Sequence, residues 1–172
     1  MLYFLNMGRG TEMKPTKRRP FTVTLLYIFH IFLGVGALAG GGSMVIDPSG
    51  DLIHIPTSML ERSPFSDFLI PGILLFIVFG ILPMLVLYGL IKRPEWHWVN
   101  TLNPFKKLYS FWAFSLYIGF GLIIWIMVQT YMLDSVVIIH LVYMSLGLLI
   151  QAVTLLPSVQ SYFLLDGGTE RR

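Results

Sequence analysis

Four long apolar runs constrain this sequence more than any other feature. An α-helix needs about 20 apolar residues to cross a hydrocarbon core of about 30 Å. Only 12% of the residues are charged, whereas soluble domains carry about twice that fraction. We therefore expect an all-α membrane protein with four transmembrane helices. The expected helices cover residues 21–43, 68–91, 109–131 and 136–156.

The runs divide the chain into a membrane domain with two loops and two tails. The expected transmembrane domain covers residues 21–157, with an outer loop at 44–67 and a cytoplasmic loop at 92–108. Residues 1–20 form a basic N-terminal tail, and residues 158–172 form a C-terminal tail.

Positive charge lies almost entirely on one side of the expected membrane. Of the 12 Lys and Arg residues, only Arg62 lies on the other side. Cytoplasmic segments are enriched in Lys and Arg, so we expect both termini and the loop at 92–108 in the cytoplasm. The net charge of +3 then indicates membrane orientation, with the lipid bilayer as partner and no nucleic acid.

The N-terminus allows two further interpretations. Met13 opens a second candidate start ahead of a basic stretch. The basic stretch, the first apolar run and Ala37-Leu38-Ala39 also resemble a cleavable signal peptide. The run is longer than a usual signal-peptide core, however, so we expect it to stay as a membrane helix.

Small residues favour close helix packing in the first run. Lipid supplies no hydrophobic force between helices, so small residues and interhelical hydrogen bonds hold membrane bundles together. The link between the third and fourth helices has four residues, 132–135, and so short a link makes them antiparallel neighbours. The small residues and the short link together predict an antiparallel four-helix bundle. The candidate packing face consists of Gly34, Gly36, Gly40 and Gly41.

Polar side chains fall on faces with three- and four-residue spacing, which is typical of a buried seam. At a rise of about 1.5 Å per residue, His30 lies near the bilayer centre. Matched depths predict that Tyr27 bonds Gln151, that Gly147 makes room for the His30 ring, and that Gln129 lies near His140. The candidate interior polar site is Tyr27, His30, Gln129, His140 and Gln151.

The outer loop is expected to be structured. Asp47-Pro48-Ser49-Gly50 is a strong turn sequence between two short apolar segments, which predicts a short β-hairpin. Ser63 or Ser66 is expected to cap the second helix, and Ser135 the fourth, with Pro157 at the end of the fourth. Pro83 cannot donate a backbone hydrogen bond, so we expect a kink in the second helix.

The loop carries the one resemblance to known proteins. The stretch Asp47-Pro48-Ser49-Gly50, followed by residues 63–72, resembles one that recurs in small bacterial multi-span membrane proteins of unassigned function. Trp125 and Gln129 are similar to a weaker part of that pattern. The resemblance implies a bacterial plasma membrane protein and no particular activity. Its motif positions are Asp47, Pro48, Gly50, Ser63, Pro64, Phe65, Asp67, Pro71 and Gly72.

Few residues suit catalysis or cofactor binding. The absence of cysteine excludes disulfides, thiolate metal sites and iron–sulfur clusters. His30 and His140 lie about 10 Å apart along the membrane normal, too far to ligate one haem iron. The acidic residues of the outer loop lack metal-ligand spacing. We therefore expect no catalytic, cofactor-binding or metal-ligating residue.

The sequence favours two functions over a third, a membrane enzyme, because the chain has few reactive side chains. The leading interpretation is a non-enzymatic accessory or structural subunit, which binds another membrane protein or a second copy of itself. The alternative is a small transporter, or a lipid- or solute-binding protein, that uses the polar interior around His30, because an ionisable residue deep in a span is a functional candidate. A water-accessible cavity at His30 would favour the alternative, and a close-packed interior the first.

Overall fold

The apolar runs form four helices that are long and apolar enough to cross a membrane. The computed structural model describes residues 18–94 and 96–165. The N-terminal tail as far as Lys17, with Met13, lies outside the described residues, as do residues 166–172. The four spans are α1 (Phe21–Ile46), a second span made of α2 (Leu69–Leu74), η3 (Leu75–Ile81) and α3 (Leu82–Lys92), then α5 (Ser110–Leu133) and α6 (Ile138–Leu155).

The helix ends differ in detail from those expected. Val137 and not Ser135 precedes α6, and the hydroxyl of Ser135 is buried without a hydrogen-bond partner. Pro157 does follow the end of α6, but it also begins a further helix, α7 (Pro157–Phe163). Proline suits a first helical position because the missing N–H would lack an intrahelical partner there.

The second span departs from a regular α-helix on the N-terminal side of Pro83. The segment η3 is a π-helix, and the N–H of Leu82 donates to the carbonyl of Ile77, five residues earlier. Pro83 lies at the start of α3 and is buried. Because proline lacks the N–H that an α-helix would use, the wider turn lies directly before it.

The four spans pack as two close pairs. In the first pair, α1 lies against the second span, where a Cβ on Gly41 would come within 2.8 Å of the Gly72 carbonyl oxygen. In the second pair, α5 lies against α6, where a Cβ on Gly147 would come within 3.3 Å of the Gly119 carbonyl oxygen. Glycine therefore brings backbones together within each pair.

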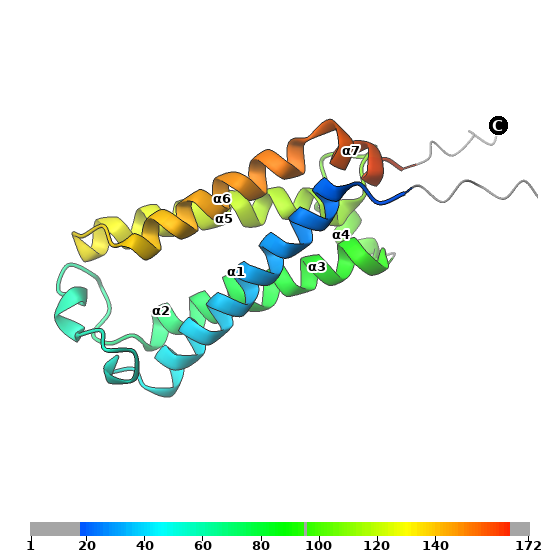
Figure 1. Ribbon diagram of the computed structural model, residues 1–172. Coiled ribbons are helices and arrows are strands. Elements are labelled where there is room, and N and C mark those ends of the chain that lie inside the picture. Colours follow the sequence, from blue (N-terminus) through cyan, green and yellow to red (C-terminus); the bar gives the residue numbers. More distant parts are fainter. Residues whose placement is uncertain (1–17, 95, 166–172) are drawn as a thin grey trace, which may run out of the picture.

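Larger side chains fill the space between the pairs. Phe79 of η3 packs on Trp125 of α5, with ring centroids 5.7 Å apart. Phe32 of α1 packs on Tyr143 of α6 at 6.1 Å. In Figure 1 the pairs converge at the end where α7 and the start of α1 lie, and diverge toward the opposite end. We call these the terminal end and the loop end.

The loop end consists of turns and 3₁₀ helices, so the predicted β-hairpin is wrong. Met44 to Ile46 continue α1, and the loop then holds η1 (Asp51–Ile53) and η2 (Thr57–Leu60). Within residues 18–94 and 96–165 there is no β-strand, only an isolated bridge between Leu108 and Leu164. Hydrogen bonding within the loop replaces pairing between strands.

The terminal end is closed by short segments that fold back on the spans. Helix α4 (His97–Thr101) precedes α5, and α7 turns across the end of α6. The N–H of Tyr109 donates to the carbonyl of Phe163 at 2.9 Å, and the N–H of Leu165 donates to the carbonyl of Lys107 at 2.9 Å. Residues 158–165, expected as part of a tail, therefore pack against the bundle.

Candidate functional site

The interior polar site contains one histidine that is completely sealed. His30 in α1 has an exposed fraction of 0%, as has Ser115 in α5. The His30 Nδ1 lies 2.9 Å from the carbonyl oxygen of Leu26. A carbonyl oxygen only accepts, so Nδ1 carries the hydrogen and the other ring nitrogen of the neutral ring accepts. The Ser115 hydroxyl then donates to Nε2 over 3.3 Å.

This histidine–serine pair bridges the two helix pairs. A serine beside a histidine is also a nucleophile–base arrangement. Because a side chain with no exposed surface touches no water-sized space, neither water nor substrate reaches Ser115 or His30. In this conformation the bond links α1 to α5 and has no route for proton transfer.

The other interior residues have partners that differ from those predicted. Tyr27 donates from its hydroxyl to the carbonyl of Leu90 at 3.1 Å, so the predicted bond to Gln151 is wrong. Gln151 instead donates through Nε2 to the carbonyl of Leu116 at 2.8 Å. Equal depth in the membrane does not make two side chains neighbours, because each helix face points in its own direction.

Gly147 does not make room for His30, which corrects a second prediction. A Cβ on Gly147 would meet Cγ1 of Ile123 at 2.9 Å, so this face of α6 lies against α5. His140 is buried near the N-terminus of α6, and its Nδ1 accepts a hydrogen bond from the backbone nitrogen of Val137 at 3.5 Å. Gln129 is half-buried, and its proximity to His140 stays a prediction.

Besides the Ser135 hydroxyl, two buried side-chain atoms lack a hydrogen-bond partner among the described residues. They are Oε1 of Gln151 and Nε1 of Trp125. Gln151 packs over Gly119, where a Cβ would come within 2.9 Å of Nε2. A buried polar atom without a partner costs about 1–3 kcal/mol, so the interior is not fully optimised for stability.

The glycine face of α1 is occupied within the chain. A Cβ on Gly34 would meet Sδ of Met84 at 2.7 Å, and Gly36 lies directly against the hydroxyl of Tyr143. Gly41 lies against the backbone of the second span, while Gly40 has only an ordinary contact with Leu75. A partner protein would therefore need another surface.

The first part of the loop motif builds a turn. The carboxylate of Asp47 accepts from the Ser49 hydroxyl at 2.6 Å and from the N–H of Leu52 at 2.8 Å. These hydrogen bonds, that of Ser49 above all, lower the pKa of Asp47. Gly50 has φ of +82° and lies against the Phe68 ring, so a side chain there would be strained. The carbonyl of Pro48 accepts from the N–H of Phe68 at 2.9 Å.

The second part of the motif leads into α2. Ser63 accepts from the N–H of Phe65 at 3.1 Å, and Asp67 accepts from the N–H of Leu69 at 3.0 Å. Asp67 thus satisfies a free N–H at the start of α2, where a serine was expected to do so. Pro64 is exposed, and Pro71 and Gly72 lie within α2. Across the described ranges, no three His, Asp or Glu side chains are grouped to hold a metal ion.

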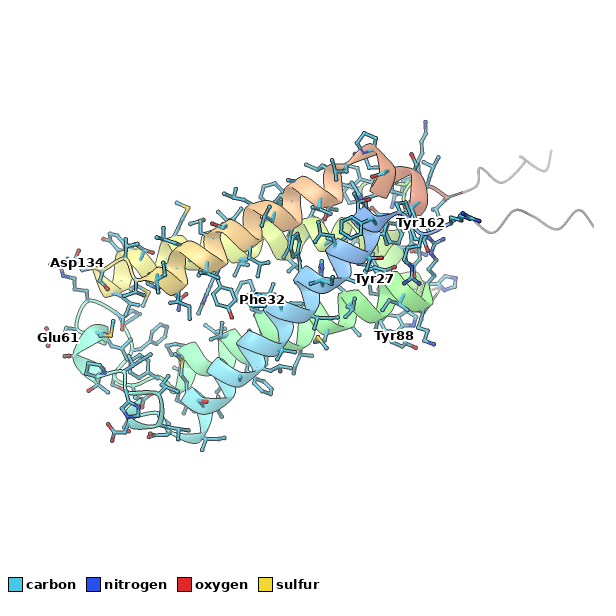
Figure 2. All side chains as sticks on the ribbon, in the orientation of Figure 1. Tyr27, Phe32, Glu61, Tyr88, Asp134 and Tyr162 are labelled. Carbon is cyan, nitrogen blue, oxygen red and sulfur yellow. The ribbon has the colours of Figure 1, made fainter. Side chains whose placement is uncertain are left out.

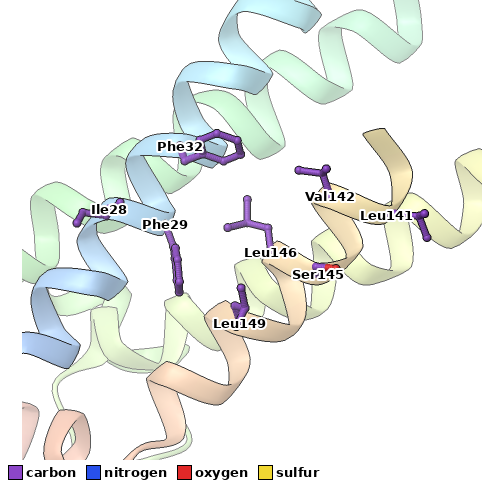
Figure 3. A pocket seen from close by; sticks show the side chains of 8 residues that line it. All are labelled: Ile28, Phe29, Phe32, Leu141, Val142, Ser145, Leu146 and Leu149. Carbon is purple, nitrogen blue, oxygen red and sulfur yellow. The ribbon is translucent and has the colours of Figure 1, made fainter. Parts of the chain in front are cut away.

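An apolar groove lies between α1 and α6 on the outside of the bundle. Phe32 from α1 and Val142 from α6 project toward the space between the helices, with Leu146 below them (Figure 3). The groove has a volume of about 490 Å³. It is lined by Ile28, Phe29, Phe32, Leu141, Val142, Ser145, Leu146 and Leu149.

The terminal end holds polar interactions that the sequence reasoning missed. Asn103 is buried and donates to the carbonyl oxygens of Phe105 and Leu108 at 3.1 and 2.8 Å. Arg93 donates to the carbonyl of Tyr162 at 3.0 Å, with its guanidinium 4.7 Å from the centroid of that ring. The available signal was Asn103 before Pro104, a common turn sequence.

The two ends of the molecule differ in their side chains, with tyrosines at one end and acidic residues at the other (Figure 2). Tyr27 and Tyr162 lie at the terminal end, whereas Glu61 and Asp134 lie at the loop end (Figure 2).

Comparison with known proteins identifies no relative of the chain. No protein-family model, curated protein or solved structure matches it.

Proposed function

We propose that this chain is a non-enzymatic accessory or structural subunit of a membrane assembly. The observation that carries the proposal is the sealed interior. His30 and its partner Ser115 each have an exposed fraction of 0%, so the histidine around which the transporter alternative is built touches no water-sized space. The bond between His30 and Ser115 joins α1 to α5, as interhelical bonds in membrane bundles do.

The groove between α1 and α6 is the proposed contact surface. The glycine face of α1 is already covered, whereas Ile28 and Phe32 on one side and Leu141 on the other remain exposed. An apolar helix of another membrane protein, or of a second copy, would fit between them. Small exposed Ser145 allows close approach along the α6 wall.

Orientation and location form part of the same proposal. The basic residues of the terminal end favour a cytoplasmic position for both termini. The resemblance of the loop motif to small bacterial multi-span proteins supports a bacterial plasma membrane. The alternative, a transporter or lipid- or solute-binding protein that uses the interior, requires a second conformation in which water reaches His30.

Photo-crosslinking in intact membranes tests the proposed contact. A benzophenone amino acid replaces Ser145 in the groove, and a matched control replaces Ile124, which is 60% exposed on α5 and outside the groove. We expect the Ser145 position to form one discrete product with a second polypeptide, and the Ile124 position to react with lipid only. Native mass spectrometry of the gently extracted protein should show the matching mass. Lipid adducts alone at both positions, with a single-chain mass, would contradict the proposal.

A further inference from the structure

A second hollow lies at the terminal end, where two spans leave the apolar region. It has a volume of about 640 Å³, within the range of about 300–1,000 Å³ typical of ligand pockets. The segment from Phe105 to Leu108 forms one wall, directly before α5. The other wall runs from Pro157 to Leu164, directly after α6.

The lining combines positive charge with apolar surface. Lys106 and Lys107 are both exposed, and within residues 18–94 and 96–165 no Asp or Glu lines the pocket. Lys106 donates one hydrogen bond, to the carbonyl of Asn100 at 3.2 Å, and an ammonium group has three hydrogens to donate. Exposed Phe105 and Leu164 supply apolar walls beside these charges. An anion with an attached hydrocarbon chain matches both properties.

The walls are held in place by the backbone. The N–H of Leu165 donates to the carbonyl of Lys107, and Leu108 pairs with Leu164 in the isolated bridge. The Phe105 ring packs edge-on against Trp112 of α5, with centroids 5.2 Å apart. The two lysines are therefore carried by a fixed segment next to the ends of α5 and α6.

We propose that this pocket binds the headgroup of an anionic phospholipid, with Lys106 and Lys107 at the phosphate. The ends of α5 and α6 place the pocket at the level where a phospholipid phosphate lies, and basic pockets at this level bind anionic headgroups. Phe105 and Leu164 contact the glycerol and upper acyl chain. A soluble phosphate would use the lysines and gain nothing from these apolar walls.

Lipid retention by the full chain tests the site. The protein is reconstituted into nanodiscs of phosphatidylcholine with 20 mol% phosphatidylglycerol, and co-purified lipid is measured by native mass spectrometry. A hydrogen bond to a charged group contributes about tenfold or more to binding, so we expect K106Q/K107Q, which removes two ammonium donors from the phosphate, to weaken phosphatidylglycerol retention by about a hundredfold. The matched control R18Q/K92Q removes two exposed charges of the same end from outside the pocket and should retain the lipid.

A second variant separates the pocket from general surface attraction. Leu164→Ser keeps both lysines and removes an apolar wall, so it should reduce phosphatidylglycerol retention severalfold without changing the charge. Equal losses in K106Q/K107Q and R18Q/K92Q would overturn the proposal, because only the summed charge would then matter. Inorganic phosphate that displaces the lipid at millimolar concentration, with no effect of Leu164→Ser, would also overturn it and indicate a soluble anion site. Thermal unfolding of each variant shows that it is folded.

Discussion

The terminal end and the loop end of the bundle are held together in different ways. At the terminal end, buried Asn103 joins the loop after α3 to Ser110 of α5 at 3.2 Å, and the stacked Arg93 joins the same loop to α7. Thr22 of α1 also bonds Ser158 of α7 at 2.9 Å. At the loop end, an exposed ion pair joins the outer loop to the α5–α6 turn, Arg62 with Asp134 at 2.6 Å. The Asn103 bonds are buried and resist water, whereas the Arg93 and Thr22 bonds are exposed, as is the ion pair, and an exposed ion pair contributes little.

The difference in contacts between the two ends indicates which part of the molecule can move. Each helix pair is fixed by glycine contacts along its length, so movement within a pair is costly. The pairs are locked to each other at the terminal end and meet through larger side chains elsewhere. We expect the loop end to open and close between pairs while the terminal end stays fixed.

Asn103→Leu should produce the largest loss of stability. The substitution leaves the carbonyl oxygens of Phe105 and Leu108 and the N–H of Phe105 without their side-chain partner. Buried groups without partners cost about 1–3 kcal/mol each, so we expect the free energy of unfolding to fall by about 3 kcal/mol. Unfolding in mixed micelles measures it. The control His97→Ala changes an exposed residue of the neighbouring α4; an equal loss there would refute the role of Asn103.

Gly41→Ala should give the next largest effect, within the first helix pair. The added Cβ would lie 2.6 Å from the backbone nitrogen of Phe76 and 2.8 Å from the Gly72 oxygen. Backbone atoms cannot turn aside, so α1 and the second span must separate, at about 2 kcal/mol.

The neighbouring glycine is a matched control for this change. A Cβ on Gly40 would meet only Cδ2 of Leu75, at 3.7 Å. Gly40→Ala should be neutral or slightly stabilising, because alanine favours the helix. If the two variants unfold alike, the backbone contact within the pair does not determine stability.

His30→Leu tests the link between the pairs at mid-depth, with a smaller effect. It removes the bond to Ser115 and leaves an apolar side chain of similar size. Interhelical hydrogen bonds in membranes contribute about 0.6 kcal/mol on average, so we expect a loss of about 1 kcal/mol or less. Ser115→Ala should cost the same and the double variant no more. A loss of function in His30→Leu with intact assembly would instead support the transporter alternative.

Much of the fold could be predicted from the sequence, because the length of an apolar run and the spacing of polar residues can be read directly along the chain. The four spans follow from the apolar runs, and the three–four spacing places Tyr27, His30 and Gln151 among the buried residues. The Asp47 turn also follows, because aspartate and glycine have specific turn geometry. These features depend on local chemistry alone.

The remaining features depend on the direction in which each side chain and each segment extends in three dimensions, which the sequence does not state. Depth along the membrane put Tyr27 level with Gln151, but the Tyr27 hydroxyl extends toward the end of α3 and bonds Leu90. The hairpin prediction failed because Met44 to Ile46 continue α1, and an apolar triplet fits a helix as well as a strand. Pro157 marked the end of one helix without indicating that it begins α7.

Arg62→Gln should have the smallest effect on stability and the clearest effect on opening. The two charged side chains are 67% and 63% exposed, so we expect the free energy of unfolding to change by about 0.5 kcal/mol or less. The chain has no cysteine, which permits paired spin labels at Ser58 and Tyr131 across the loop end. Their distance distribution, measured by pulsed electron paramagnetic resonance, should broaden in Arg62→Gln.

The same experiment at the terminal end completes the test. Labels at His97 and Leu156, both exposed, should keep a narrow distribution in Arg62→Gln. Salt at 1 M, where the screening length is about 3 Å, should broaden the loop-end distances of the unmodified protein in the same way. If the distances of both label pairs broaden together, the helix pairs separate at both ends, and the terminal end is not fixed. If neither changes, side-chain packing between Phe79 and Trp125 holds the loop end without the ion pair.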